Sequence, residues 1–433
     1  MRKIALTLLL LLAVTFGLRA QFYSPGTDPG RLRWYTIDSP YYRIIYPEGA
    51  DSLARSYLRL MEQFREPIGR SIRYTPQATP WSRKFPIVLH THHLVSNGSV
   101  AYAPLRMDFY TTPDSYGSNP TSWPIELASH EPRHQAQLGK LESAGFLKGL
   151  GYVLGQGSAP LGWMLYLAST RGEGDAVVAE TGLALGTRAR TADFLNYMQV
   201  AFDQGDWRSL TRWSKGSYKH FTPDYYKAGY MLMAGMRYLY SDTFYTAEGI
   251  EKVFKNPMLI APFNYNKVIK KLSGKYPEGA FKDIMHAFND VWQADAAARA
   301  PFINLGEPVT PADAFPLNYS SPIWADGTLY ALREGYLKSP ELVSIKDGHI
   351  RRERSFSSQT SHLAYDPVRG RIYWTEILPH LRWSLDGTSA LRYMDLKTRR
   401  TRDLAPGHRY FNPSPSPDGT RVAVVEYAVT GES

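Results

Sequence analysis

Residues 130–134, in the stretch ELASHEPRHQAQL, have the order His-Glu-Pro-Arg-His and could hold a metal ion. On an α-helix, side chains four positions apart lie on the same face, so His130 and His134 can direct ring nitrogens to one ion. Glu131 would then lie beside the open coordination position, where a carboxylate can act as general base toward a water molecule. This order of residues indicates a site for metal-assisted hydrolysis.

Two histidines are too few for such a site, because a catalytic zinc normally has three protein ligands and one open position. The chain contains no cysteine, so the third ligand must be His, Asp or Glu. The stretch RGEGDAVVAET, residues 171–181, offers two carboxylates on one helix face, because Glu173 and Glu180 are seven positions apart. Asp175 lies between them and is a further candidate.

Together the two stretches resemble the gluzincin zinc metallopeptidases, in which a Glu-Gly-x-Ala motif on a second helix follows the His-Glu-x-x-His helix. More closely, Ser-His-Glu-x-Arg-His-x-x-Gln followed by Glu-Gly-Asp-Ala is similar to exported bacterial proteins that join a peptidase-MA-like gluzincin domain to a TolB-like propeller. The resemblance extends from about Trp34 to the end of the chain.

The resemblance implies a Zn²⁺ ion with three protein ligands: His130, His134 and Glu173. It makes Glu131 the base that activates the water. It also implies that Asp175 and Glu180 orient a ligand or meet a substrate amine.

Gluzincins also use a tyrosine to stabilise the oxyanion, often three residues before a glycine at the start of a helix. Tyr226 precedes Gly229 by three positions, so the resemblance makes Tyr226 a second candidate catalytic residue. A packing role stays equally open, because Tyr225 and Tyr230 lie beside it.

Residues 100–110, VAYAPLRMDFY, have the composition of a strand, and Pro104 favours an edge position because proline has no N–H to donate. Related domains place an edge strand that pairs with an extended peptide just before the His-Glu-x-x-His helix. The expected partner is therefore a peptide or protein substrate.

The residues His90, His92 and His93 form a rival candidate for a metal site. His90 and His92 would lie on the same face of a strand. No carboxylate motif accompanies them, which favours the site at His130.

Pro132 departs from the resemblance, because related motifs have a helix-forming residue there. Inside a helix, proline removes the hydrogen bond to the carbonyl four residues earlier, here Ala128, and costs about 3 kcal/mol or more. We expect a bend that leaves His130 and His134 able to converge on one ion. The sequence leaves open whether the bend keeps Glu131 directed at the open coordination position.

The order of predicted elements favours an α+β domain, which the resemblance specifies as zincin-like, over residues 21–300. Strand-like and helical segments alternate at first, and residues from 122 to about 295 are mainly helical in pattern. The uncharged stretch 149–170 is broken by glycines and Pro160, so it predicts a buried helical hairpin, or a loop touching the membrane face, rather than a membrane span.

Residues 301–433 contain short β-rich runs with Asp near a Gly-containing turn. Asp326, Asp366 and Asp418 are spaced by 40 and 52 residues, which suits propeller blades. Ser-Pro-Asp-Gly at 416–419 resembles the turn of TolB-like and WD40-like propellers. Because fewer than four blades fit, we expect an incomplete all-β propeller.

Residues 1–20, MRKIALTLLLLLAVTFGLRA, have the basic start, apolar run and small terminal residue of a cleaved signal peptide. This predicts an exported protein of the periplasm or cell envelope of a Gram-negative bacterium, with no transmembrane span once the signal is removed. The formal net charge of +10 comes from scattered basic residues, which argues against a nucleic-acid partner.

Two classes of function stay open. One is a zinc-dependent envelope peptidase that hydrolyses peptide bonds with a metal-activated water and Glu131 as general base. The other is a catalytically degenerate envelope protein that binds a partner through its propeller.

Overall fold

The structure is a computed structural model that describes residues 27–431 with the following parts left out: 78–83, 103, 115–119, 144–148, 150, 152, 154, 156–167, 207, 218–219, 221, 241–263, 304–305, 311–312, 314, 316, 336 and 358–360. The predicted signal peptide lies outside the described residues, as does most of the uncharged stretch 149–170. No helix in the described part of the chain is both long and apolar enough to cross a membrane.

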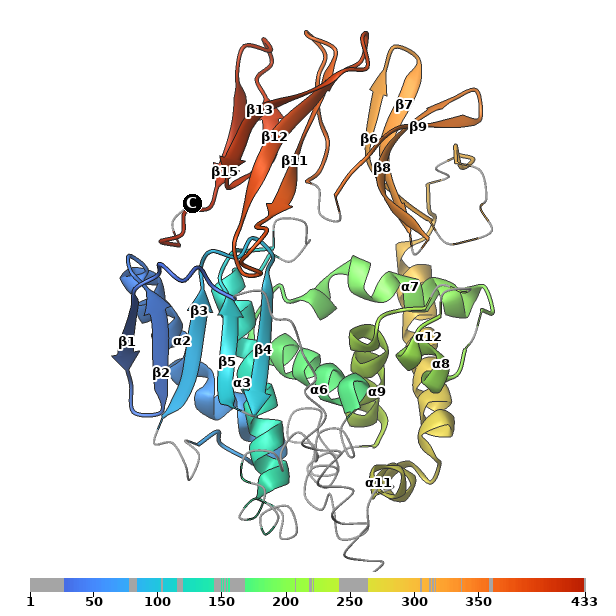
Figure 1. The fold of residues 1–433 in the computed structure, drawn as a ribbon. Coiled ribbons are helices and arrows are strands. Elements are labelled where there is room, and N and C mark those ends of the chain that lie inside the picture. Colours follow the sequence, from blue (N-terminus) through green and yellow to red (C-terminus); the bar gives the residue numbers. More distant parts are fainter. Residues whose placement is uncertain are drawn as a thin grey trace, which may run out of the picture.

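A mixed five-stranded sheet forms the first layer (Figure 1). Its strands in chain order are β1 (Trp34–Asp38), β2 (Tyr42–Pro47), β3 (Phe85–His90), β4 (Asn97–Tyr102) and β5 (Leu105–Tyr110). Their order across the sheet is β1-β2-β3-β5-β4, so β4 is an edge strand. The prediction of one edge strand over residues 100–110 is wrong, because these residues divide between the end of β4 and the whole of β5, and β5 lies inside the sheet between β3 and β4. The pairs β2–β3 and β3–β5 are parallel, whereas β1–β2 and β4–β5 are antiparallel.

Helices α2 (Asp51–Gly69) and α3 (Trp123–Glu142) cover one face of this sheet. Alternating residues of β2 and β3, including Tyr42, Ile44 and Ile87, are fully buried against the helices. This packing removes apolar surface from water and fixes α3 against the sheet beside β4.

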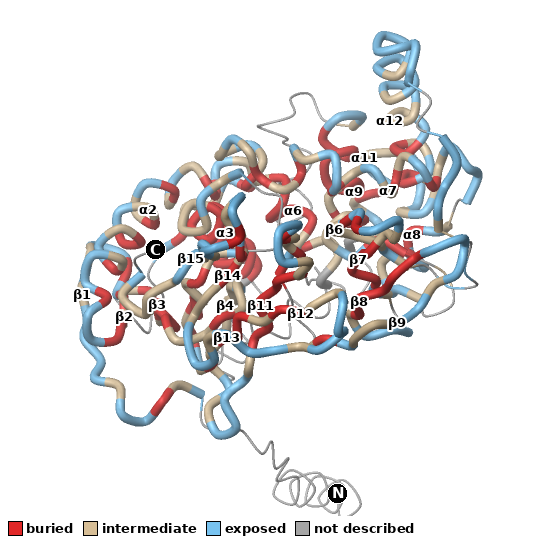
Figure 2. Tube along the Cα trace, turned by 90° about the horizontal axis from the view of Figure 1, so that it is seen from above, coloured by how far each residue is buried: buried red, intermediate tan, exposed pale blue. Residues whose placement is uncertain are grey.

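Further helices extend the domain away from the sheet: α6 (Ala168–Leu183), α7 (Ala192–Asp203), α8 (Leu210–Lys215), α9 (Tyr225–Tyr240), α11 (Asn264–Ser273) and α12 (Pro277–Arg299), with short 3-10 helices η1 (Arg70–Ile72) and η4 (Arg188–Arg190). Buried residues concentrate along α3, α6 and α9, whereas the outer strand β1 is largely exposed (Figure 2). The centre of the domain therefore lies where α3, α6 and α9 meet.

The C-terminal part consists of antiparallel strands. One four-stranded sheet contains β6 (Leu317–Ala325), β7 (Thr328–Gly335), β8 (Lys338–Lys346) and β9 (His349–Ser355), and a second contains β10 (Ala364–Asp366), β11 (Arg371–Pro379), β12 (Gly387–Asp395) and β13 (Thr401–His408). The strands β14 (Tyr410–Pro415) and β15 (Val422–Glu426) form a separate hairpin.

The predicted fold class, an α+β zincin-like domain followed by an incomplete propeller, is therefore wrong. The described residues form helices, one mixed sheet and several small antiparallel sheets, with no propeller or closed barrel among them. The turns that suggested blades do join hairpins, as at Asp326 between β6 and β7. An Asp-Gly turn specifies only that the chain reverses, and the same turn serves any antiparallel sheet.

Arg409 joins the C-terminal strands to the first sheet. Its guanidinium donates to the backbone oxygens of Thr91 and His92 at 2.9 and 2.8 Å and to the hydroxyl of Thr112 at 3.1 Å. These acceptors lie just beyond β3 and β5, so the antiparallel sheets sit at the carboxyl end of these two strands (Figure 1).

Candidate metal centre

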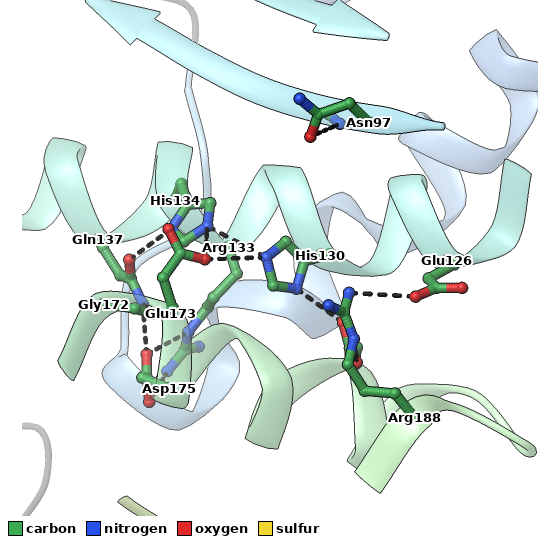
Figure 3. A network of polar contacts seen from close by, with 12 residues as sticks. Asn97, Glu126, His130, Arg133, His134, Gln137, Gly172, Glu173, Asp175 and Arg188 are labelled. Carbon is green, nitrogen blue, oxygen red and sulfur yellow. Dashed lines mark hydrogen bonds and ion pairs between the residues drawn. The ribbon is translucent and has the colours of Figure 1, made fainter. Parts of the chain in front are cut away.

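The side chains of His130, His134 and Glu173 converge at the crossing of α3 and α6 (Figure 3). Oε2 of Glu173 lies 3.3 Å from Nε2 of His130 and 3.1 Å from Nε2 of His134, and the two ring nitrogens are 3.3 Å apart. Donor atoms that bind zinc at about 2.0–2.1 Å in a tetrahedron lie about 3.3 Å from one another. The spacing of these three atoms therefore fits one metal ion.

The rival histidines do not form such a group. His90 contacts Asp28 and Asp108, His92 lies near Asp386, and His93 bonds the backbone oxygen of Val95. Within the described residues, only His130, His134 and Glu173 bring three ligand atoms together.

Helix α3 carries both histidines without interruption from Trp123 to Glu142, although Pro132 lies inside it. Pro132 is buried, and the carbonyl of Ala128 cannot receive the usual hydrogen bond from that position. The proline therefore leaves the helical spacing of His130 and His134 intact.

Helix α6 reaches the site because two glycines allow it to touch α9. A Cβ atom on Gly174 would overlap the backbone of Gly229, and one on Gly229 would overlap the carbonyl oxygen of Thr170. This backbone contact places Glu173, which precedes Gly174, close to Tyr226, which lies one helical turn before Gly229.

Glu180 contacts a metal-ligand candidate directly. Its Oε2 accepts a hydrogen bond from Nδ1 of His130 at 2.7 Å, which leaves Nε2 of the ring facing Glu173. Arg188 of η4 holds Glu180 through two bonds of 2.8 and 3.2 Å and also pairs with Glu126 at 3.1 Å. Arg188 was missed by sequence reasoning, because no spacing connects it to the two motifs.

Asp175 reaches the other histidine only through Gln137. Nδ1 of His134 lies 3.0 Å from Oε1 of Gln137, and Nε2 of Gln137 donates to Asp175 at 2.8 Å. The Asp175 carboxylate also accepts bonds from the buried Arg133 and Arg237. Gln137 is three positions after His134, so its helical spacing was a usable signal.

A cavity of about 270 Å³ opens onto the site between α3 and the edge strand β4. Its lining includes His130, Glu131, Tyr226, Arg188 and Gly98. A Cβ atom on Gly98 would overlap Oε1 of Glu131, so the strand passes directly beside this carboxylate. Burial raises the pKa of Glu131, which favours its uptake of a proton.

Tyr226 lies on the same cavity wall, with its ring centroid 6.2 Å from that of His130 and 4.7 Å from that of Tyr225. Burial, and then the charge of Glu173, raise the pKa of its hydroxyl well above the ordinary value. The hydroxyl is therefore a neutral hydrogen-bond donor at neutral pH.

The centre binds protons at the atoms that would bind a metal. Burial lowers the pKa of His130, but hydrogen bonds to Glu173 and Glu180 outweigh it and raise that pKa to about 10. Metal ions and protons compete for such nitrogens, so metal affinity falls as the pH is lowered.

Comparison with protein-family models gave no match for this chain, and no curated protein is similar enough to it to be counted as a relative.

Proposed function

We propose that the protein is a zinc-dependent peptidase of the cell envelope with a gluzincin-type site. The observation that carries the proposal is the convergence of His130, His134 and Glu173, with spacing suited to one ion, beside the buried Glu131. Two imidazoles and one carboxylate are a ligand set typical of catalytic zinc.

The edge strand β4 supports a peptide as the substrate. Its outer side presents backbone N–H and C=O groups that no other strand of the described sheet occupies. An extended peptide can pair with such an edge. Because Gly98 of this strand lies directly beside Glu131, a peptide paired there would have its scissile bond near that carboxylate.

When bound, zinc supplies Lewis acidity that lowers the pKa of a water molecule and polarises a carbonyl. Glu131 takes a proton from the attacking water and passes it to the departing nitrogen. The hydroxyl of Tyr226 donates to the carbonyl oxygen as negative charge develops there. Glu180 keeps the ring of His130 in one orientation through Nδ1.

The first test is the metal content of the mature chain, measured by mass spectrometry after dialysis against zinc. We expect one zinc per chain, lost in His134→Ala. The exposed His349 provides a control, and His349→Ala should keep the metal. Equal zinc content in both variants would refute the proposed ligand set.

The second test is hydrolysis of casein and of a mixed peptide library. Glu131→Gln should keep zinc and lower the rate by about 10²–10⁴-fold, because proton transfer by a placed carboxylate contributes about that much. The exposed Glu48 supplies the control Glu48→Gln, which should keep full activity. A zinc-loaded chain that cleaves no peptide would instead favour a binding protein with a degenerate peptidase site.

A further inference from the structure

A second cavity, of about 250 Å³, lies between the end of α2, η1 and the face of α6 that points away from Glu173 and Glu180. Its apolar wall includes Ile68, Val178 and Leu183, and its polar lining comes from Arg70, Ser71 and Arg237. No described Asp or Glu residue lines it. The cavity is thus apolar with cationic groups at its boundary.

The interior beside this cavity holds more positive than negative charge. Arg133 and Arg237 share the single carboxylate of Asp175, with N–O distances of 2.7 and 2.6 Å. All three side chains are buried: Arg133 and Asp175 are 0% exposed and Arg237 is 2% exposed. Among the described residues, the other groups that accept hydrogen bonds from these two guanidinium groups are neutral backbone oxygens of Ile68 and Met233.

Two buried cations with one buried anion are unfavourable, because an uncompensated charge loses its hydration without gaining a counterion. Burial, and then repulsion from Arg133, lower the pKa of Arg237, although Asp175 opposes this shift. An anion placed in the cavity next to Arg237 would supply the missing charge.

We propose that the cavity binds a small amphipathic anion, a monocarboxylate with a short apolar tail. The carboxylate approaches Arg237, and the tail packs on Val178 and Leu183. The volume lies below the range of about 300–1,000 Å³ that is usual for drug-sized ligands, which favours a short tail. Arg70 is exposed at the boundary and forms no ion pair in the described part of the chain, so it adds a second positive charge. This site is independent of the proposed peptidase activity.

Calorimetric titration of the mature protein with octanoate, 1-octanol and acetate tests the proposal. We expect one octanoate per chain, and at least about tenfold weaker binding of octanol, which lacks the charge, and of acetate, which lacks the tail. Absence of saturable octanoate binding at millimolar concentration, or equal affinity for octanol, would overturn the proposal.

Two variants and one control test where octanoate binds, and none of them removes a buried ion pair. Ala179→Phe, on the cavity wall, should fill the space and weaken octanoate binding at least about tenfold, with circular dichroism to confirm folding. Arg70→Gln should weaken it about two- to fivefold, as expected for an exposed charge. Arg55→Gln, at an exposed position of α2 that does not line the cavity, is the matched control and should have no effect. Unchanged octanoate affinity in a folded Ala179→Phe variant would place the ligand elsewhere and end the proposal.

Discussion

Oε2 of Glu180 lies 2.7 Å from Nδ1 of His130, while Nε2 of the same ring faces Glu173 at 3.3 Å. A ring that donates through Nδ1 keeps the lone pair of Nε2 for a metal ion, so this bond selects the useful tautomer. Arg188 holds Glu180 in place through hydrogen bonds to both of its carboxylate oxygens. The orientation of His130 therefore depends on a carboxylate that comes from another helix.

Glu180→Gln should weaken zinc binding by about 10–100-fold, as is usual when the partner of a metal-binding histidine is lost. Competition with a chromogenic chelator measures the affinity. Glu126→Gln is the matched control, because Glu126 also pairs with Arg188 and lines the same cavity. If both variants lose zinc affinity equally, zinc binding depends on the charge around Arg188 and not on the hydrogen bond from His130 to Glu180.

Gly98→Ala should lower the rate of peptide hydrolysis at least about tenfold and leave zinc affinity unchanged. The added Cβ would overlap Glu131 and lie 2.6 Å from Cδ2 of Leu127, so the proposed general base must move while the three proposed metal ligands stay in place. Steady-state kinetics and metal content of one preparation give both quantities. Ser99→Ala, on the same strand, should behave like the parent, and full activity of Gly98→Ala would show that Glu131 does not act from this position.

Pro132→Ala should raise the free energy of unfolding by about 1–3 kcal/mol, because an N–H returns to bond the carbonyl of Ala128 in the helix interior. Chemical denaturation measures this gain, and zinc content should stay at its original value. Pro124→Ala in the same helix is the control, since Pro124 is in the first turn, where proline is tolerated. A loss of zinc in Pro132→Ala would mean that the proline is needed to orient His130 and His134 toward the ion.

His90 should make the stability of the protein depend on pH. Burial lowers its pKa, but hydrogen bonds to Asp108 and Asp28 outweigh this and raise the pKa to about 9, above the ordinary value of 6.5 for a histidine side chain. Because the folded pKa is the higher one, the stabilisation is fully present below pH 6.5 and is lost as the pH rises through about 9.

Urea denaturation of the parent and of His90→Asn at pH 6 and at pH 9.5 tests this dependence. The unfolding free energy of the parent minus that of His90→Asn should be larger at pH 6 than at pH 9.5, by up to about 3 kcal/mol. His349→Asn, at an exposed position, should show no such change. A difference that is the same at both pH values would mean that His90 is neutral in the folded protein.

The sequence alone determined the local geometry of the centre. His130 and His134 are four positions apart in a segment of helical pattern, and the α-helical repeat then places them on one face wherever the helix packs. This spacing depends only on residues that are neighbours in the chain, so it can be read from the sequence.

Only the tertiary structure decided which partners meet. The close crossing of α6 and α9 at Gly174 and Gly229 places Glu173 at the histidines, whereas Asp175 on the same helix points to two buried arginines. Arg188 joins the site from a segment whose sequence carries no signal of its own. The propeller prediction failed for the same reason: turn residues specify local chain reversals, but the arrangement of hairpins is set by long-range packing of side chains that lie far apart in the sequence.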